Sequence, residues 1–393
     1  MHIGFLVETP ITKEKRMYGA QISFLNLLRE LLSLGVSPYV VVSEEWELTD
    51  KLKEFGISVL ITPIYEFFTS VDGAYGEYHD SEKQKKQNAL SFKAMKEYFE
   101  ENNVELIHMN TRFCGLLGAQ VATEMNIPYI FHIREFLRED FGLIFKDESL
   151  ADRIIGNSNC LIAISASIKS YLSAIYPSTR IELIYNGLVL EKYFRSECER
   201  FNDKIIKIAI VGRVISHKGQ LEAIKAIEHI VNTTDYKHIV LKVVGIRPDE
   251  MTEYENMLVD YVTTNNLSNY IDFVPFTDKV EDVLANCDIG LTCSKMEAFG
   301  RVTVEYMLSH LLAIGANSGG TPEVIDNMIS GLLYDKGNYI SLANSIIWAI
   351  EHPVEANEII NNGHRKAISN YTSKKNAAEV LSLYKDILQI RNE

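Results

Sequence analysis

Short, continuously apolar runs alternate with amphipathic helical patterns along the first half of the chain. The first run, HIGFLV (2–7), is followed by the amphipathic stretch GAQISFLNLLRELLSLG (19–35). Strands that are buried on both faces of a sheet are rich in Val, Ile and Leu, and their alternation with helices indicates parallel βαβ units. Further runs of this kind occupy 37–43, 57–62, 104–110, 128–133, 160–165 and 181–185.

The second half of the chain repeats this arrangement. KIAIVG (207–212) leads into a helical pattern over 218–231, and 338–391 reads as mostly helical. The same alternation therefore predicts a second parallel sheet. Its other apolar runs lie at 239–245, 270–276, 287–293, 311–316 and 331–335.

These patterns predict an α/β protein with two Rossmann-like, doubly wound domains that face each other across a cleft. We expect an N-terminal domain over 1–187 and a C-terminal domain over 188–372, with a last helix at about 373–393 packing back on the first domain. Ligands of such sheets bind beyond the carboxyl ends of the strands, so the cleft is the expected site. No GxGxxG follows either first strand, which weakens a dinucleotide-binding oxidoreductase without excluding it.

Composition and charge narrow the function classes further. The net charge of −14 argues against nucleic acid as a partner, because a binder needs basic patches that neutralise phosphates. The opening MHIGFLVETP lacks the features of a signal peptide, and no apolar run approaches the roughly 18–20 residues of a membrane span. The five cysteines have no CxxC spacing, so they predict neither a disulfide framework nor a zinc site. We expect a cytoplasmic protein.

The stretch SKMEAFGRVTVEYM (294–307) carries two glutamates, Glu297 and Glu305, in largely apolar surroundings. We expect a helix that starts near Gly300. The backbone N–H groups of Arg301, Val302 and Thr303 have no partners within such a helix, which makes its start an anion site suited to a phosphate. Two carboxylates beside a phosphate site must address other parts of the ligand, and hydroxyl groups are their natural partners. This pattern favours a nucleotide-diphosphate sugar, although each glutamate alone is also a common favourable partner of a helix dipole.

Two cations follow the first strand of the second half. Arg213 and Lys218, in IVGRVISHKG, come after a strand whose carboxyl end faces the expected cleft. An Arg offers a planar fork for phosphate oxygens and a Lys offers a point charge. We expect both to contact phosphate, and the alternative is a pair of solvated surface cations. The glycine-rich turn SGGTPEV (318–324) lies near the same end of the sheet.

Together, VGRVISHKG, SKMEAFGRVTVEYM and SGGTPEVI resemble the donor domain of the retaining glycosyltransferases of family 4, which have the GT-B fold. The two glutamates match the E-x7-E motif of that family. YGAQISFLNLLREL resembles the glycine-rich first loop and helix of the family, and IFHIREF resembles its histidine-bearing loop. The resemblance covers almost the whole chain and is most specific in the C-terminal half.

The resemblance implies a role for each residue. Glu305 would accept hydrogen bonds from the ribose hydroxyls, and Glu297 would face the hydroxyls of the donor sugar. His132 would lie near the transferred sugar, and Gly19 would let the first loop approach the phosphates. The diphosphate would be held by Arg213, Lys218 and the N–H groups after Gly300, at Arg301 and Val302.

The chain departs from the family at two places. The first loop reads YGAQ where two glycines are common, so the approach of Tyr18 to the donor is open. His132 is followed by Ile-Arg-Glu where many members have an acid directly, so the roles of Arg134 and Glu135 are open.

The family chemistry implies transfer with retention, by front-face attack in which the leaving phosphate helps to take the proton of the acceptor. The donor would be a UDP-sugar, with GDP-mannose as an alternative. No Asp-x-Asp lies between apolar residues, so we expect no metal and no cofactor besides the nucleotide sugar. No residue stands out as the general base.

The acceptor is expected to bind the N-terminal half as a glycan or a lipid-linked acceptor, in bacterial surface polysaccharide or glycoconjugate synthesis. A basic stretch over 80–99 and an apolar-rich loop over 136–147 fit an anionic membrane surface or a lipid diphosphate, or equally a solvated helix face and a packed loop. Peripheral contact with the cytoplasmic face of the inner membrane follows from the first reading. The lysines of the basic stretch are Lys83, Lys85, Lys86, Lys93 and Lys96.

Other functions fit the same fold. A GT-B sugar epimerase or phosphorylase would release no nucleotide in the presence of an acceptor. A non-catalytic, glycan-binding partner subunit would lack the phosphate-binding cations and the two acids, all of which are present here.

Overall fold

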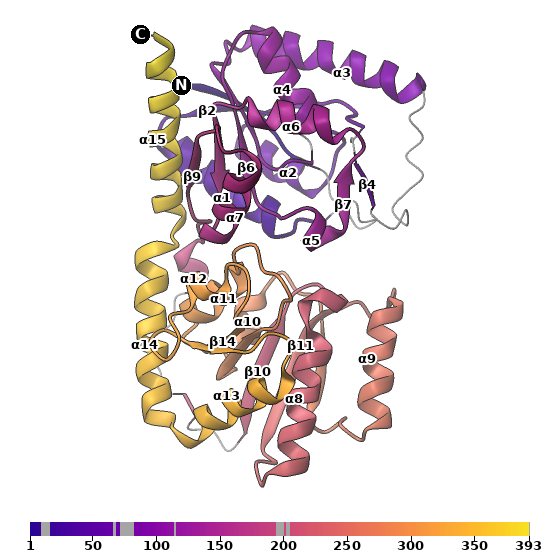
Figure 1. The fold of residues 1–393 in the computed structure, drawn as a ribbon, viewed down its shortest axis with the longest axis vertical. Helices are drawn as coiled ribbons and strands as arrows, with labels where there is room; N and C mark the ends of the chain where they lie inside the picture. The colour runs from indigo at the N-terminus through magenta and orange to yellow at the C-terminus, as the bar shows by residue number, and fades with distance from the viewer. Residues whose placement is uncertain are drawn as a thin grey trace. The chain divides into compact units, whose positions relative to one another are not determined.

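The computed structural model describes residues 1–8, 16–65, 68–70, 82–113, 115–193, 200–201 and 205–392. The chain forms two compact units, Met1–Leu188 with Ser373–Glu393, and Val189–Thr372. Each unit is built on a parallel sheet, so the predicted pair of doubly wound α/β domains is confirmed (Figure 1). The division between the units falls beside the expected boundary of 187/188, and the C-terminal helix belongs to the first unit.

The first unit has a seven-stranded parallel sheet with the order β3-β2-β1-β5-β6-β8-β9. Its order reverses between β1 and β5, because β2 and β3 continue to one side of β1 whereas β5, β6, β8 and β9 continue to the other. The strands are β1 His2–Leu6, β2 Ser37–Val42, β3 Ser58–Ile61, β5 Leu106–Met109, β6 Tyr129–Ile133, β8 Cys160–Ala163 and β9 Ile181–Leu183.

Helices cover both faces of this sheet. One face packs on α1 (Gly19–Ser33) and α15 (Ser373–Asn392), which contact each other and contribute Leu27, Leu31, Val380 and Leu383 to the core. On the other face the ring of Phe99 from α3 lies against Gly4 of β1, and Leu6 lies against Gly118 of α4. The further helices are α2 Glu47–Glu54, α3 Glu82–Glu101, α4 Gly115–Glu124, α6 Glu148–Gly156 and α7 Ala166–Ile175.

The segment 136–147, expected as an apolar-rich loop, instead carries regular structure. It contains the short helix α5 (Arg138–Phe141) and the strand β7 (Leu143–Phe145), which pairs antiparallel with β4 (Phe68–Ser70). Leu143 and Phe145 are buried, and the rings of Phe68 and Phe145 pack at a centroid distance of 4.6 Å. The apolar residues of this segment therefore build a small second sheet.

The second unit has a six-stranded parallel sheet with the order β12-β11-β10-β13-β14-β15, which reverses between β10 and β13. The strands are β10 Ile206–Val211, β11 Ile239–Ile246, β12 Ile271–Pro275, β13 Ile289–Thr292, β14 Leu312–Ala316 and β15 Leu332–Tyr334. The helices are α8 Gln220–Thr233, α9 Glu253–Thr264, α10 Val280–Leu284, α11 Arg301–Leu308, α12 Thr321–Val324, α13 Tyr339–Glu351 and α14 Pro353–Asn370, with short 3-10 turns at Leu190–Lys192 and Ser216–Lys218.

The sheet of the second unit is also sandwiched between helices. Apolar residues of α8, α9 and α13 share one core with Ile208, Ile210 and Leu241 of the strands. On the other face, the ring of Tyr306 from α11 lies directly on Gly290 of β13, and α14 packs on α11 and β14. A methyl group on Gly290 would lie 2.2 Å from that ring. Within the described ranges, no helix is both long and apolar enough to span a lipid bilayer.

Candidate functional site

In the second unit, two loops meet where the strand order reverses. The loop 212–219 follows β10 and the loop 293–300 follows β13, so both leave the carboxyl ends of the central strands. The N–H of Lys295 donates to the carbonyl oxygen of His217 at 2.9 Å, which ties the loops together. The amide of Gln220 donates to the carbonyl oxygen of Arg213 at 2.9 Å, which holds the first loop against α8. Ligand sites of doubly wound sheets lie at such a reversal.

An ion pair joins the two loops. Lys218 Nζ lies 2.8 Å from Glu297 Oε2, and Ser294 Oγ donates to the same oxygen at 2.7 Å. The pair is largely shielded, with exposed side-chain fractions of 30% for Lys218 and 16% for Glu297. Burial by itself raises the pKa of this carboxyl, but the Lys218 ammonium and hydrogen bonds from Ser294 and the Gly300 N–H outweigh it and hold the pKa below its usual value. Glu297 is therefore an ionised acceptor near neutral pH.

The helix α11 begins directly after this glutamate. Its N-cap is Gly300, with φ 92° and ψ 47°, a left-handed conformation that side chains disfavour. A Cβ on Gly300 would also lie 3.1 Å from Thr303 Oγ1. Helical geometry leaves the first N–H groups after the cap without acceptors inside the helix, so Arg301 and Val302 present N–H groups at the positive end of α11.

A second glycine-rich turn fixes the backbone of Glu297. The N–H of Gly320 donates to the carbonyl oxygen of Glu297 at 2.6 Å, and Ser318 Oγ donates to that of Lys295 at 2.7 Å. Gly319 has a φ of 58°, and a Cβ there would lie 2.3 Å from the same Glu297 oxygen. The predicted SGGTPEV turn thus packs closely against the loop 293–300 and holds its backbone through these hydrogen bonds.

The carboxylate of Glu305 forms an ion pair with an arginine of the same helix. Arg301 Nε lies 3.0 Å from Glu305 Oε1 in an i,i+4 pair, with exposed side-chain fractions of 15% and 8%. The phenol of Tyr193 lies against the same carboxylate, and burial together with the Glu305 charge raises the pKa of that phenol. Of the two predicted phosphate-binding cations, Lys218 pairs with Glu297, whereas Arg213 is exposed on its loop. The cation that pairs with Glu305 is the side chain of Arg301, of which only the backbone N–H was predicted to contact phosphate.

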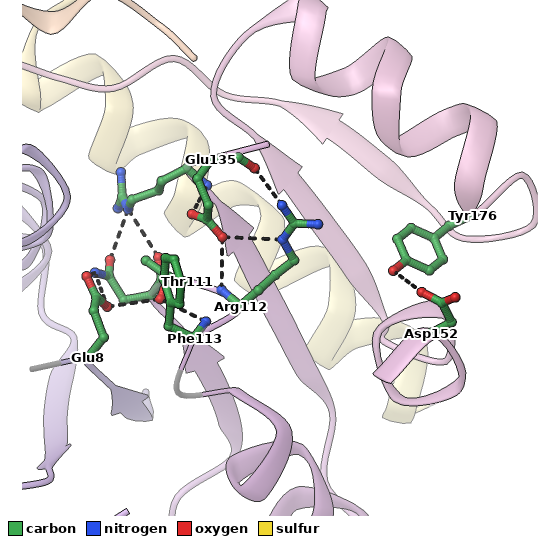
Figure 2. A network of polar contacts seen from close by, with 9 residues as sticks. Glu8, Thr111, Arg112, Phe113, Glu135, Asp152 and Tyr176 are labelled. Atoms are coloured by element: carbon green, nitrogen blue, oxygen red, sulfur yellow. Dashed lines mark hydrogen bonds and ion pairs between the residues drawn. The ribbon is translucent and has the colours of Figure 1, made fainter. Parts of the chain in front are cut away.

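In the first unit, a buried polar network occupies the corresponding reversal between β1 and β5. Glu8, which follows β1, accepts hydrogen bonds from Gln21 Nε2 at 2.7 Å, Thr111 Oγ1 at 3.1 Å and Asn110 Nδ2 at 3.2 Å. Figure 2 shows Glu8 directed toward Thr111. Burial raises the pKa of the Glu8 carboxyl, opposed by the Asn110 amide and the charge of Arg134.

Two arginines extend this network to the end of β6. Arg112 Nε lies 3.3 Å from Glu135 Oε1, and its NH2 donates to the Glu135 carbonyl oxygen at 2.8 Å (Figure 2). Arg134 Nε donates to Asn110 Oδ1 at 3.1 Å, and Arg134 NH1 donates to Asn186 Oδ1. Arg134 and Glu135, whose roles the sequence left open, are therefore buried structural partners of the strand ends.

His132 and Gly19 occupy different parts of the first unit. His132, near the end of β6, is fully buried, and its Nδ1 lies 3.3 Å from both His108 Nε2 and Arg134 NH2. Burial and the neighbouring Arg134 and His108 hold the pKa of His132 well below its usual value. Gly19 is the first residue of α1, and a Cβ built on it would have no neighbour within 4 Å. Open space at Gly19 is compatible with a ligand at that helix end.

The residues that the sequence did not single out share one signal. Each lies within about three residues of the carboxyl end of a buried strand of the first unit, where ligands of such sheets bind. Glu8 follows β1, and Asn110, Thr111 and Arg112 follow β5. The position of polar residues just after an apolar run is therefore the sequence signal that could have identified them. Among the described residues, no group of three or more His, Cys, Asp or Glu could hold a metal ion.

Comparisons with known proteins cover both units. The family model for glycosyltransferase family 4 matches residues 17–192, and that for glycosyl transferases group 1 matches residues 194–366. N-acetyl-alpha-D-glucosaminyl L-malate synthase of Bacillus anthracis is 23% identical over 305 residues, which span 75% of this chain and 78% of that enzyme. The capsular polysaccharide biosynthesis glycosyltransferase CapM of Staphylococcus aureus is 24% identical over 242 residues, spanning 58% of this chain and 62% of CapM.

Solved structures share the fold over almost the whole length. HepE of Anabaena in complex with UDP-glucose has a TM-score of 0.78 at 20% identity, covering 98% of this chain and 100% of HepE. The same protein was also solved in complex with UDP, again with a TM-score of 0.78. The similarity extends across both parallel-sheet units.

The Lys218–Glu297 pair generates a stability prediction. Lys218→Met leaves a shielded carboxylate without its cation, so the free energy of unfolding at pH 7 should fall by about 1–3 kcal/mol. The lowered pKa of Glu297 means that the wild-type advantage is present above pH 4.5 and is lost as the pH falls through the folded-state value, so the gap should close in acid. Fluorescence of Trp348, in a Trp46→Phe background, follows the unfolding of this unit.

Lys242→Met is the matched control, because Lys242 lies 3.2 Å from Asp272 in a pair whose acid is half exposed. Its loss should cost less than about 1 kcal/mol. Equal losses in the two variants, or a gap for Lys218→Met that widens in acid, would contradict the pairing described here.

Proposed function

The chain belongs to the glycosyltransferases of family 4 and group 1, with the GT-B fold, and from this premise we propose that it is a retaining, metal-independent hexosyltransferase. It moves a sugar from a nucleotide-diphosphate sugar to a hydroxyl group of an acceptor. The donor is a UDP-sugar, with GDP-mannose as the alternative, and no further cofactor takes part.

The observation that carries this proposal is the charge arrangement at the end of β10 and β13. Glu297 lies just before the N-terminal end of α11 and Glu305 lies in its second turn, and each of these carboxylates is already paired with a cation. Unpaired, these acids would repel a diphosphate. Paired with Lys218 and Arg301, they offer acceptors for hydroxyl groups while the cations and the helix end attract phosphate.

Each residue then has a chemical task. Glu305 accepts hydrogen bonds from the ribose, and Glu297 accepts them from the donor sugar. As the bond between sugar and diphosphate breaks, negative charge grows on the leaving phosphate, and preorganised donors that meet such charge are usually the largest catalytic contribution. These donors are Arg213, Lys218 and the N–H groups after Gly300, at Arg301 and Val302. Attack from the front face retains the configuration, and the leaving phosphate takes the proton of the acceptor.

The donor and acceptor classes rest on similarity. HepE, of the same fold, binds UDP and UDP-glucose, which supports a uridine nucleotide here. CapM acts in capsular polysaccharide biosynthesis, which supports a glycan or lipid-linked acceptor in bacterial surface polysaccharide synthesis. The helix α3 supports a peripheral membrane contact at the cytoplasmic face, because Leu90, 63% exposed, lies between the exposed Lys86 and Lys93.

A thermal-shift screen tests the proposal. UDP and UDP-glucose, each with and without EDTA, should raise the unfolding temperature, since a ligand at 100 times its dissociation constant stabilises by roughly 2.7 kcal/mol. GDP-mannose tests the alternative donor, and NAD serves as the negative control. Stabilisation by NAD alone would favour an oxidoreductase, and stabilisation that vanishes in EDTA would reveal a metal site.

Glutamine substitutions separate the roles of the two acids. Glu305→Gln should weaken binding of UDP and of UDP-glucose alike, by about 1.5–3 kcal/mol for a hydrogen bond to a charged group. Glu297→Gln should leave UDP binding almost unchanged, since UDP has no sugar to contact, and should lower turnover of UDP-glucose.

Titration calorimetry measures the binding of UDP and of UDP-glucose to each of the two variants. Glu323→Gln changes an acid of the nearby helix α12 and is the control, because it should change the affinity for neither UDP nor UDP-glucose. Equal weakening of UDP by Glu297→Gln and Glu305→Gln would refute the division of labour.

A further inference from the structure

A chain of three aromatic side chains crosses the buried face of the first unit. His108 on β5 and His132 on β6 project from the same face of the sheet, because His108 pairs in register with Ile130, two residues before His132. Their rings stack at a centroid distance of 5.3 Å, and Nε2 of His108 lies 3.3 Å from Nδ1 of His132. Tyr384, from the C-terminal helix α15, places its hydroxyl 2.5 Å from Nδ1 of His108.

Arg134 determines in which direction the hydrogen bonds of this chain run. Its NH2 group lies 3.3 Å from Nδ1 of His132, and a guanidinium can only donate, so Nδ1 of His132 is an acceptor. His108 Nε2 approaches the same acceptor and must therefore carry a proton. In a neutral His108 this leaves Nδ1 as the acceptor, and the Tyr384 hydroxyl donates to it.

Both imidazoles are neutral near pH 7. Burial and the charge of Arg134 lower the pKa of His108 to about 3, and burial, Arg134 and His108 hold the pKa of His132 well below its usual value. A neutral imidazole has one proton. Because Nδ1 of His132 accepts, its proton lies on Nε2.

We infer that Tyr384, His108 and Arg134 are positioning residues that hold His132 in the Nε2–H tautomer, so that His132 donates a hydrogen bond to an oxygen of the transferred sugar. This inference rests on the proposed function for the identity of the ligand. It assigns the tautomer, and the part played by the C-terminal helix, from the hydrogen bonds of this chain.

The second ring nitrogen of His132, Nε2, indicates a ligand-binding role. Nε2 is buried and has no hydrogen-bond partner among the described residues. A buried donor without an acceptor is rare in folded proteins, and it costs free energy that a suitably placed ligand oxygen recovers. The same assignment means that His132 cannot take the proton of the acceptor hydroxyl, because Nε2 already carries a proton and Nδ1 already accepts two. The proton must leave by another route, consistent with transfer to the departing phosphate.

Histidine-selective ¹⁵N NMR reads the tautomer directly, without turnover. The His132 signals, identified by their loss in His132→Gln, should show a protonated Nε2 and an unprotonated Nδ1, unchanged between pH 5.5 and 8, about one unit below and 1.5 above the ordinary histidine pKa. A protonated Nδ1, or titration in that range, overturns the assignment. Tyr384→Phe should change the His108 signals, whereas Tyr129→Phe, which removes a hydroxyl on β6 that donates to Ile154 at 2.9 Å, should not.

Release of UDP from UDP-glucose tests the donor role. Tyr384→Phe should lower kcat by about tenfold with little change in KM, the loss expected for one misplaced hydrogen bond. Tyr129→Phe should leave kcat unchanged. His132→Gln retains a side-chain N–H at that end and should keep clearly more activity than His132→Leu, with folding of both checked by thermal unfolding.

Equal loss in the glutamine and leucine variants would overturn the donor role, because glutamine keeps a side-chain N–H that can donate and leucine has none. A wild-type protein that releases neither UDP from a UDP-sugar nor GDP from GDP-mannose would instead refute the proposed function. The tautomer of His132 would still be tested independently by the NMR measurement.

Discussion

The ion pair between Lys218 and Glu297 is the contact on which the arrangement of the second unit's strand ends depends. It joins the loops after β10 and β13, at the point where the strand order reverses, and it keeps a shielded carboxylate ionised. Without a cation at hydrogen-bonding distance, burial would favour the neutral acid. The glycines at 319 and 320 serve the same loop, because each lets backbone come closer to Glu297 or Ala298 than a side chain would permit, and Gly300 supplies the left-handed conformation after it.

The carboxyl groups near the strand ends have different environments in the two units. In the second unit, Lys218 pairs with Glu297 at 2.8 Å and Arg301 pairs with Glu305 at 3.0 Å, and the pKa of Glu297 is held below its usual value. In the first unit, Glu8 and Glu135 are buried, and burial raises the pKa of both carboxyls against the effect of neighbouring donors. Burial, together with the charge of Arg134, lowers the pKa of His108 and of His132. The cation beside Glu297 therefore outweighs burial and keeps that carboxylate ionised, whereas burial opposes the ionisation of Glu8 and of Glu135 even though Arg112 pairs with Glu135.

Much of this could be predicted from sequence because the signals are local. A continuous apolar run followed by a helical pattern is enough to predict a parallel strand, and a glycine between a strand and a helix predicts the cap at Gly300. The segment 136–147 was predicted wrongly as a loop, since its three-residue strand β7 exists only through pairing with β4, more than seventy residues earlier. Tyr384 lies 276 residues from His108, and no spacing rule connects them.

The sequence singled out both glutamates around the start of α11, but it did not predict which cation pairs with which acid. Sequence showed Arg213 and Lys218 together and treated both as phosphate ligands, whereas in the structure Lys218 pairs with Glu297 and Arg301 with Glu305. Which cation lies next to which acid depends on how the two loops approach each other, and the hydrogen bond between Lys295 and His217 and the turn at Gly319 act together with the ion pair to hold that approach. These are contacts between loops far apart in the chain.

Amide hydrogen exchange with and without UDP tests most directly whether the end of β10 and β13 binds the nucleotide. Bound UDP should slow exchange in 213–219 and 295–303, where the loops and the first turn of α11 would be covered, and should leave the amides of α9 unchanged. Unaltered exchange in both segments at a saturating concentration of UDP, or slowing confined to other parts of the chain, would contradict the assignment of this end of the sheet as the donor site.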